Sequence, residues 1–349
     1  MNNSLTDVAG FRVGHAAVPG PNALSGTTVV LAPPGGAVAA VEVRGGGPGT
    51  RETDALDPKN VVERIDAVVL TGGSAYGLDA AAGVMAWLEE QGRGVRVGPE
   101  PYQVVPVVPA ACLFDLGRGG DWRARPDASV GRAAVEAAGV EVAEGNVGAG
   151  TGAVVGGLKG GVGTASVTLA SGVTVAALAV VNAVGSPVDP HNGALYGEYG
   201  DTPTPQLPSS ERHLAAQARL AATRQDMPPL NTTLAVVATD ARLTRPQAQK
   251  LAGTSHDGLA RAIRPVHLMH DGDTIFALAT GSHDSDPAKA SHDSGPAKTD
   301  GPLSPEELNH VLAAGADVVA RAIVRGVRAA GSVEGSGGTF LSYGDLYGS

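Results

Sequence analysis

The chain has 349 residues, which is long enough for one or two domains with a large buried core. Its net charge of −10 and the absence of a basic cluster argue against nucleic acid as a partner. A single cysteine, Cys112, excludes an internal disulfide and suits a reducing compartment. Because the chain has 50 glycines and only 3% aromatic residues, we expect a core of Ala and Val packed through close backbone approach.

The sequence predicts neither a signal peptide nor a membrane helix. The first eleven residues contain Asp7, no basic residue and no long apolar run. Residues 160–188 carry no charge, but their Gly, Ser and Thr content and the break at 170–172 indicate two buried strands joined by a turn. We therefore expect a soluble, cytoplasmic protein with no membrane partner.

The N-terminal part of the chain alternates short strand-like runs with Pro and Gly. Runs at 11–13, 27–31 and 37–43 predict strands. The loop at 45–54 is too glycine-rich for regular structure. It fits either backbone wrapped closely around a site or a plain surface loop.

Residues 65–70 predict a strand, which the turn at 71–77 leads into a helix ending near Gly92. Spacing of three and four places Leu78, Ala81, Ala82, Met85 and Leu88 on its inner face.

Ser74 lies on the turn between this strand and this helix, as the serine of a nucleophile elbow does. An elbow needs glycine at the second position after the serine, where this chain has Tyr76. We therefore interpret Ser74 as a turn residue and keep Tyr76 as a candidate substrate contact.

Lys159 is the only lysine between Lys59 and Lys250, and its surroundings look buried. A buried lysine needs a partner or a function, so Lys159 is a candidate site residue, the alternative being an edge-strand lysine that reaches solvent. The flanking glycine-rich stretches at 145–152 and 157–164 do not match dinucleotide or P-loop patterns in register, and no cofactor is predicted.

Asn182 closes the predicted strand at 173–181. An amide at the end of a buried strand can point into a cleft and serve as an oxyanion donor, although asparagine also forms turns. Residues 186–230 then predict a polar connection with one helix at 211–223, and a self-cleavage site could be exposed in it.

Thr232 follows Asn231 and stands at the first position of an uncharged, Val-rich run that predicts a buried strand. A hydroxyl residue at this position can attack the carbonyl before it and become a new N-terminus. Its α-amine, with a pKa of about 8, is then a base beside its own nucleophile. The Asn-Thr pair also fits ordinary turn chemistry at a strand entrance.

Asp271 and Asp273 flank Gly272 at the entrance to another apolar strand. If this strand neighbours the one after Thr232, both acids can orient the amine of Thr232 and hold a proton. A metal site with His267 and His270 ranks lower because the spacing fits no compact zinc pattern, and a plain turn is a third interpretation.

Two helices are expected in the C-terminal part. The first starts at 244–246 and is ended by Pro265, and its inner face is Leu251, Ala252, Ser255, Leu259, Ala262 and Ile263. The second starts at a capping box, 304–307, and buries Leu308, Val311, Leu312, Gly315, Val319 and Ile323. Between them, a duplicated octapeptide at 282–298 indicates a disordered insertion at 282–303 without a catalytic role.

These segments together resemble the L-aminopeptidase/D-esterase family, which includes β-peptidyl aminopeptidases and a 6-aminohexanoate-oligomer hydrolase. The resemblance rests on residues 5–15, 46–54, 70–77, 159–161, 181–183, 231–233 and 271–273, in that order. It implies an α/β fold, a four-layer α/β/β/α sandwich of the aminopeptidase/ornithine-acetyltransferase type. It also implies one catalytic domain over 1–349, self-cleavage into 1–231 and 232–349, no cofactor or metal, and a homo-oligomer, with a tetramer favoured.

Carried over by position, Thr232 is the nucleophile and base, and Asn182 is the oxyanion donor. Asp271 and Asp273 orient the nucleophile, while Lys159 is a polar member of the site. Where several relatives place a site tyrosine, this chain has Phe114, which removes a hydroxyl from the substrate pocket and leaves substrate preference open.

The resemblance implies hydrolysis of small peptides or related amides through an acyl-enzyme. Two alternatives stay open. One is acyl transfer to an amine acceptor, and the other is a non-catalytic protein of the same fold that binds small molecules.

Overall fold

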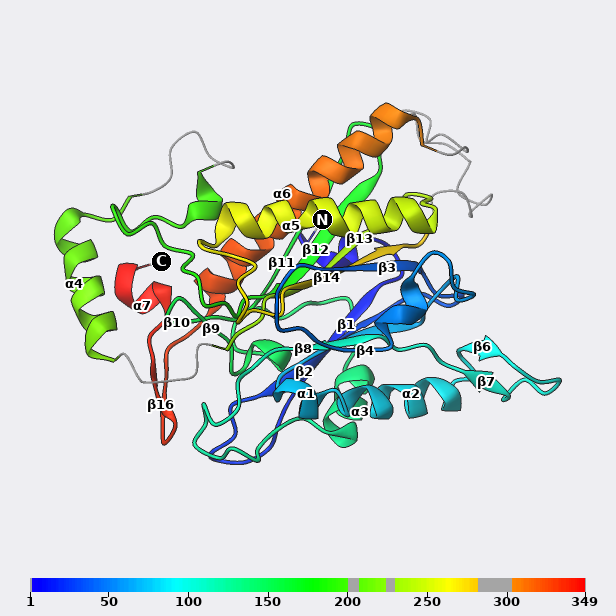
Figure 1. The fold of residues 1–349 in the computed structure, drawn as a ribbon, viewed down its shortest axis with the longest axis horizontal. Helices are drawn as coiled ribbons and strands as arrows, with labels where there is room; N and C mark the ends of the chain where they lie inside the picture. The colour runs from blue at the N-terminus through cyan, green and yellow to red at the C-terminus, as the bar shows by residue number, and fades with distance from the viewer. Residues whose placement is uncertain (1, 200–206, 224–229, 282–302, 349) are drawn as a thin grey trace.

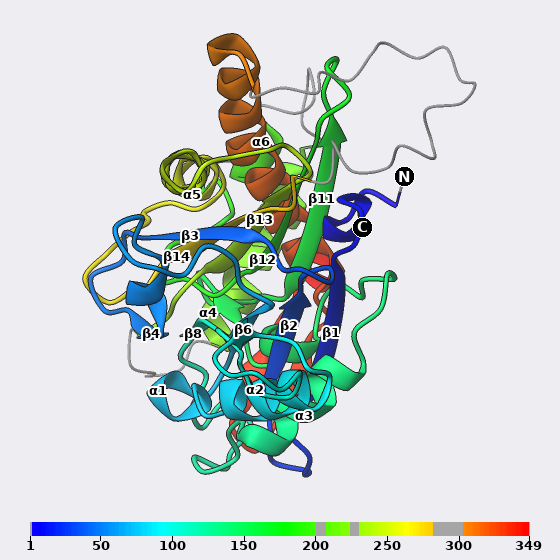
Figure 2. The same cartoon turned by 90° about the vertical axis from the view of Figure 1, so that its right-hand side faces the viewer.

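The computed structural model describes residues 2–199, 207–223, 230–281 and 303–348. Two five-stranded sheets lie face to face, and helices cover the outer side of each (Figure 1, Figure 2). The chain is therefore the four-layer α/β/β/α sandwich that was expected. The insertion predicted at 282–303 lies, apart from Leu303, outside the described residues.

The first sheet has the order β1-β2-β5-β8-β4, and only the β5–β8 pair is parallel. Its strands are β1 (Arg12–Ala17), β2 (Gly26–Leu31), β5 (Ala67–Thr71), β8 (Ala110–Cys112) and β4 (Gly49–Arg51). Helices α2 (Ala80–Glu90) and α3 (Ala128–Glu136) pack on its outer face, after the short α1 (Ser74–Gly77).

The inner face predicted for the helix after Gly73 is wrong in part. The helix is divided into α1 and α2, and α2 buries Ala80, Ala81, Gly83, Val84 and Leu88, while Ala82 and Met85 are half-buried. The reason is that the backbone of α2 at Gly83 packs directly against α3. A Cβ on Gly83 would lie 1.8 Å from the Ala128 carbonyl oxygen. This close backbone approach turns the helix so that Gly83, rather than Met85, faces inward.

The second sheet has the order β11-β12-β13-β14-β3, with one parallel pair, β13–β14. Its strands are β11 (Val162–Thr168), β12 (Thr174–Val180), β13 (Leu234–Thr239), β14 (Thr274–Ala279) and β3 (Val38–Val43). The β11–β12 hairpin confirms the interpretation of residues 160–188, and the β13–β14 pair confirms that the two C-terminal strands are neighbours.

Helices α5 (Arg245–Ala262) and α6 (Pro305–Ala329) cover the second sheet. The inner face predicted for α5 is buried at every position. The capping box at Ser304 and Glu307 is present, although Leu308 and Leu312 only border the core of α6. None of the helices in the described ranges is long and apolar enough to span a lipid bilayer.

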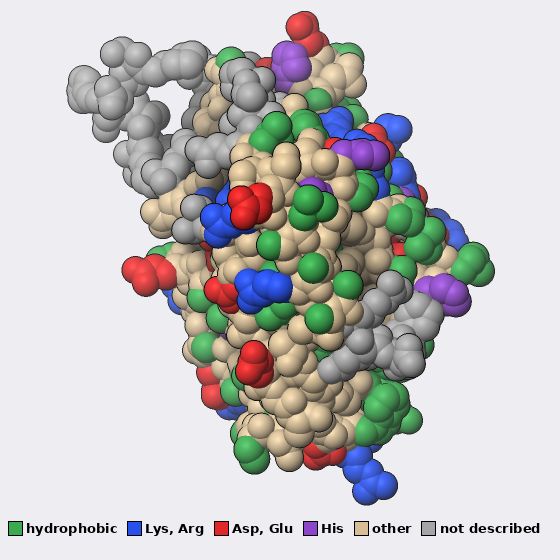
Figure 3. Space-filling view, turned by 90° about the vertical axis from the view of Figure 1, so that its left-hand side faces the viewer, with side chains coloured by type: hydrophobic (Ala, Val, Ile, Leu, Met, Phe, Trp, Pro, Cys, Tyr) green, Lys and Arg blue, Asp and Glu red, His purple; other side chains and the backbone are tan. Residues whose placement is uncertain are grey.

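The remaining elements are short or peripheral. They are α4 (Ser210–Ala222), α7 (Tyr343–Tyr347), β6 (Val95–Arg96), β7 (Val104–Val105), β9 (Val154–Val155), β10 (Leu158–Lys159), β15 (Val333–Gly335) and β16 (Gly338–Phe340). On the face seen from the side of α4, acidic, basic and hydrophobic side chains are interspersed (Figure 3).

β13 is uncharged because both of its faces are buried. Leu234 and Val236 point into the core between the sheets, and Ala235 and Val237 point into the core beneath α5 and α6. The strand ladder starts at Leu234, two residues later than predicted. Thr232 therefore lies just before the strand, where the backbone is free to meet other groups.

Candidate active site

The ends of three strands place the predicted site residues together. In the second sheet Val180 pairs with Leu234, and Leu234 pairs with Thr274. Asn182 therefore follows β12, Thr232 precedes β13 and Asp273 precedes β14 at the same edge of the sheet. Parallel pairing of β13 and β14 makes both strands begin at this edge.

Thr232 is 3% exposed in the continuous chain. Its backbone N–H donates to the Asn182 carbonyl oxygen at 2.9 Å. Its hydroxyl donates to the carbonyl oxygen of Asn231 and accepts from the Gly272 N–H, 3.1 Å away. The hydroxyl thus lies against the peptide bond that self-cleavage would break.

Asp273 is fully buried and accepts three N–H groups. Oδ1 accepts from the Thr233 backbone at 2.9 Å, and Oδ2 accepts from the backbone of His267 at 3.1 Å and from its Nδ1 at 2.8 Å. The carboxylate therefore fixes the backbone next to Thr232. His267, which the sequence offered only as a metal ligand, is its partner, and the described residues contain no group of three His, Cys, Asp or Glu side chains arranged to hold a metal ion.

Asp271 is also fully buried, but it is held less firmly. Its Oδ1 accepts from the Val184 N–H at 3.2 Å, and its Oδ2 has no hydrogen-bond partner within the described part of the chain. Burial, and then the charge of Asp273, raises the pKa of Asp271. A carboxyl of this kind is suited to exchange a proton rather than to brace the fold.

Arg118 orients Asn182, a contact that the sequence did not predict. Its Nη1 donates to Asn182 Oδ1 at 2.6 Å and to the Gly152 carbonyl at 2.7 Å, and Val154 N–H also donates to Asn182 Oδ1, at 2.9 Å. With its oxygen occupied, Asn182 presents Nδ2 as a donor whose acceptor, the Phe114 carbonyl oxygen, is 3.5 Å away. This long contact leaves Nδ2 available for a developing oxyanion.

Lys159 is fully buried, as expected, and its Nζ donates to the carbonyl oxygens of Gly150, Ala153 and Gly160 at 2.9, 3.1 and 2.6 Å. The structure does not bring it into hydrogen-bond contact with Thr232. Instead it stabilises the glycine-rich backbone around it, whose Gly152 carbonyl accepts from Arg118 and whose Val154 N–H donates to Asn182. Burial, followed by repulsion from Arg118, lowers the pKa of Lys159 to about 7.

We expect Lys159→Met to lower the free energy of unfolding by about 2–4 kcal/mol, because three buried carbonyl oxygens lose their donor. Folding depresses the pKa of this lysine, so the folded chain binds fewer protons than the unfolded chain between about pH 7 and the ordinary value of 10.5. The contribution of Lys159 to the free energy of unfolding of the wild-type protein therefore increases as the pH rises through this window. Urea denaturation should show a larger loss for Lys159→Met at pH 9 than at pH 7, and an equal loss would contradict the assignment.

The glycines of the 45–54 loop wrap closely around the turn that carries both aspartates. Gly47 N–H donates to the Asp271 carbonyl at 2.8 Å, and a Cβ on Gly45 would lie 2.3 Å from the Asp273 nitrogen. A Cβ on Gly272 would lie 2.6 Å from the Thr232 hydroxyl oxygen. The close-wrapping interpretation of this loop agrees with these contacts.

Gly272→Ala should therefore displace Thr232 and slow any reaction of its hydroxyl by about 100-fold, the usual effect of a 1 Å misplacement. Gly253→Ala is the matched control, because a Cβ there meets nothing within 4 Å and lies inside α5. That control should stabilise the helix by about 1 kcal/mol. Kinetics and thermal unfolding of both variants check this, and a fully active Gly272→Ala enzyme would contradict it.

The rings of Tyr76 and Phe114, the two residues predicted for the substrate pocket, contact Arg125 and Trp122. Tyr76 is 57% exposed and lies under the Arg125 guanidinium, 3.8 Å from ring centroid to Cζ. The Phe114 ring packs edge-on against Trp122 with centroids 6.2 Å apart. Phe114 therefore faces Asn182 through its backbone carbonyl, which any residue at this position would supply.

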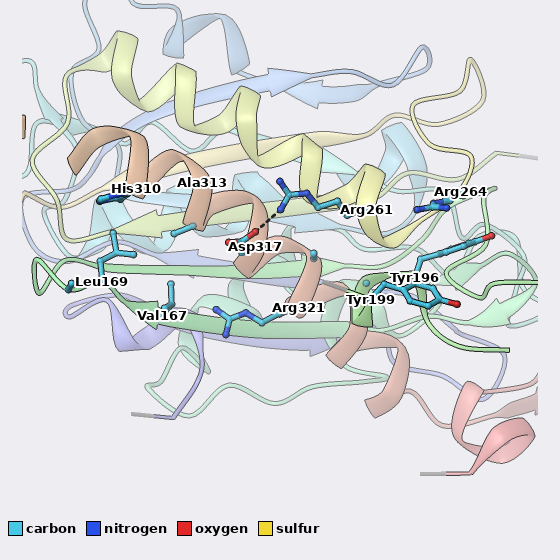
Figure 4. A pocket seen from close by; sticks show the side chains of 14 residues that line it. Val167, Leu169, Tyr196, Tyr199, Arg261, Arg264, His310, Ala313, Asp317 and Arg321 are labelled. Atoms are coloured by element: carbon cyan, nitrogen blue, oxygen red, sulfur yellow. Dashed lines mark hydrogen bonds and ion pairs between the residues drawn. The ribbon is translucent and has the colours of Figure 1, made fainter. Parts of the chain in front are cut away.

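A cleft of about 630 Å³ opens beside the site. Arg118, Asn231 and Val184 line it, together with α4 and the loop at 183–186. A larger groove of about 870 Å³ lies between β11, α5 and α6 and shares Arg264 with this cleft (Figure 4). Arg261 and Asp317 form an ion pair there, and none of the predicted site residues lines it. The smaller cleft is therefore the one that borders the predicted site, through Arg118 and Asn231.

Comparisons with known proteins identify the family of this chain. The sequence model of peptidase family S58 matches residues 3–340. An uncharacterized aminopeptidase of Mycobacterium tuberculosis is 50% identical over 347 residues, covering 95% of this chain and 96% of that protein. A 6-aminohexanoate-oligomer endohydrolase of Kocuria sp. is 32% identical over 290 residues, covering 80% of this chain and 75% of that protein.

Solved structures show the same fold. A beta-aminopeptidase of Burkholderia sp. has a TM-score of 0.71 at 25% identity, covering 98% of this chain and 91% of that one. The L-aminopeptidase D-Ala-esterase/amidase of Ochrobactrum anthropi, described as a variant of the Ntn hydrolase fold, has a TM-score of 0.69 at 23% identity over 98% and 91% of the two chains. The chain thus has the fold of the Ntn-hydrolase-like aminopeptidases, and it belongs to peptidase family S58, the family of the L-aminopeptidase/D-esterases.

Proposed function

We propose that the protein is a self-cleaving amide hydrolase in which Thr232 is the nucleophile, acting on small peptides or related amides. The observation that carries this proposal is the position of the Thr232 hydroxyl, which is hydrogen-bonded to the Asn231 carbonyl and to the Gly272 N–H. A buried hydroxyl held against its own preceding peptide bond is positioned for an intramolecular acyl shift.

In self-cleavage the Thr232 oxygen attacks the carbonyl carbon of Asn231. The C–N bond between the two residues breaks, the nitrogen gains the hydroxyl proton and an ester joins Asn231 to Thr232. Water then hydrolyses the ester, which leaves a carboxylate on Asn231 and a free hydroxyl and α-amine on Thr232. Asn182 Nδ2 is the donor for the oxyanion.

In the mature enzyme the α-amine of Thr232 takes the proton of its own hydroxyl. The Asn182 carbonyl already accepts from this nitrogen at 2.9 Å, so it holds the amine in place. Asp271 and Asp273 stabilise the ammonium that forms. The hydroxyl oxygen attacks a substrate amide, the amine leaves with that proton, and water releases the acyl group.

The two fragments are expected to stay together. β12 of residues 1–231 pairs with β13 of residues 232–349 over six residues, and β3 pairs with β14 over six more. Cleavage breaks neither ladder. The paired fragments form a homo-oligomer in this proposal, and light scattering after gel filtration would give its size.

Activity is tested with aminoacyl, β-aminoacyl and 6-aminohexanoyl amides, the last two because similar proteins are named for such substrates. Each amide is assayed with and without an amine acceptor. We expect release of the amine in water alone. Turnover only with the acceptor would indicate acyl transfer, and cleavage of the chain without turnover of any amide would indicate a non-catalytic binding protein.

A further inference from the structure

We propose that Arg118 determines specificity, by binding a carboxylate or carboxamide oxygen on the side chain of the substrate's acyl residue. The enzyme would then prefer amides of aspartate and asparagine. This inference rests on the proposed function, because it takes Asn231 as the acyl residue of the first reaction that Thr232 performs.

Asn231 shows how an acyl residue sits against Thr232. Its carbonyl accepts from the Thr232 hydroxyl, while its side-chain Oδ1 accepts from Arg118 Nη2 at 2.6 Å. The backbone N–H of Asn231 donates to the His270 carbonyl at 3.2 Å. The scissile carbonyl and the γ-oxygen are therefore held at once, by two different groups.

Arg118 is a buried cation whose Nη2 donates to a neutral partner, the Asn231 side chain. The side chain is 3% exposed, no carboxylate forms an ion pair with it within the described residues, and its Nε has no hydrogen-bond partner there. Asp115 interacts with it electrostatically and, with a pKa that burial raises to about 6, is still mostly ionised at pH 7. Asp115 does not contact Nη2, however, so a carboxylate or carboxamide oxygen that replaces Asn231 Oδ1 there gains a charge-assisted hydrogen bond.

The position that Asn231 occupies borders a cleft. Both Arg118 and Asn231 line the 630 Å³ cleft. Gly156, Gly157 and Gly185 also line it and have no side chains that would fill it. After cleavage, the C-terminal end at Asn231 is no longer tied to Thr232. Its departure leaves Nη2 facing the cleft, and the next acyl residue takes the same two contacts.

The reaction that follows is hydrolysis of the substrate's amide bond. The Thr232 oxygen bonds to the acyl carbon, the C–N bond breaks, and the amine leaves with the proton that the Thr232 α-amine had taken. Water then cleaves the ester to give free aspartate or asparagine and the original hydroxyl.

The test compares p-nitroanilides of L-Asn, L-Asp and L-Leu, because the Asn and Leu side chains have the same branching. For the purified wild-type protein we expect kcat/KM to be at least about 10-fold higher for Asn and Asp than for Leu, since one hydrogen bond to a charged group contributes about 1.5–3 kcal/mol. In Arg118→Met the ratio of Asn to Leu should fall to about 1. Arg264→Met is the matched control, because it changes another arginine of the same cleft and should keep the wild-type ratio.

A wild-type enzyme that hydrolyses the Leu amide as fast as the Asn amide would overturn the inference while leaving the proposed function intact. Absence of turnover of every amide would overturn both. If Arg118→Met does not fold, Asn231→Leu tests the same contact in self-cleavage, because leucine cannot accept the hydrogen bond from Arg118 Nη2. Its self-cleavage should be at least about 10-fold slower than that of wild type, and an unchanged rate would contradict the role of Arg118.

Discussion

Thr232→Ala should leave the protein as a single chain of 34.7 kDa and abolish amide hydrolysis, because it removes the hydroxyl oxygen that lies against the Asn231 carbonyl. Loss of a nucleophile that acts together with its base lowers kcat by about 10⁶-fold. Thr232→Ser keeps the oxygen and should still split and turn over. Intact mass and amide hydrolysis measure both effects.

Thr233→Val is the matched control for this prediction. Thr233 is equally buried, and its hydroxyl donates to the Asn182 carbonyl at 3.2 Å, but it does not touch the Asn231 carbonyl. Valine keeps the shape of the side chain, so this variant should still cleave. Splitting of Thr232→Ala before residue 232 would refute the assignment of the nucleophile.

Asp273→Asn should reduce self-cleavage and hydrolysis by about 100- to 1,000-fold, the cost of losing one well-placed electrostatic contact in an active site. The carboxylate of Asp273 accepts three N–H groups, from Thr233 and twice from His267. An amide presents an NH₂ group to at least one of these donors, which also destabilises the fold by about 1–3 kcal/mol. Single-turnover cleavage rates and urea denaturation measure the two losses.

Asp271→Asn is the matched comparison, because Asp271 accepts only one N–H and its second oxygen is unpartnered in the described residues. It should lose activity but keep its fold, and gain about 1 kcal/mol of stability at neutral pH, as relief of strained sites commonly does. An Asp271→Asn variant as unstable as Asp273→Asn would contradict the different roles given to the two acids.

The pH dependence of this gain has a defined sign. Burial and Asp273 raise the pKa of Asp271, so this carboxyl binds more protons in the folded chain than in the unfolded chain. Its contribution to stability is present below the ordinary pKa of 3.8 and is lost as the pH rises through the raised value. The stability gain of Asp271→Asn should therefore be seen at pH 7 and disappear in acid.

The family resemblance predicted the layers, whereas local signals in the sequence predicted the strand entrances that carry the site. The uncharged run after Thr232 and the Asp-Gly-Asp turn each mark a strand entrance, and parallel pairing of the two strands brings them together. Burial of Lys159 was likewise predictable from its surroundings. That it would bond three backbone carbonyls was not, since those contacts depend on the path of a glycine-rich loop.

Arg118 could not be found from the sequence. It stands between Gly117 and Gly119 in what looks like a surface turn, and its partners Asn182 and Asn231 are 64 and 113 residues away. The flanking glycines were the one available signal, because a Cβ on Gly119 would lie 2.4 Å from the Asn22 carbonyl oxygen. Such crowding holds the turn inward and buries the guanidinium.

The central claim is that Thr232 becomes the first residue of a new chain. Intact mass and N-terminal sequencing of the purified, unmodified protein test it most directly. We expect two fragments that elute together, 1–231 and 232–349, the second beginning Thr-Thr-Leu-Ala. A chain that stays whole on prolonged incubation, or a cut at any other bond, would contradict it.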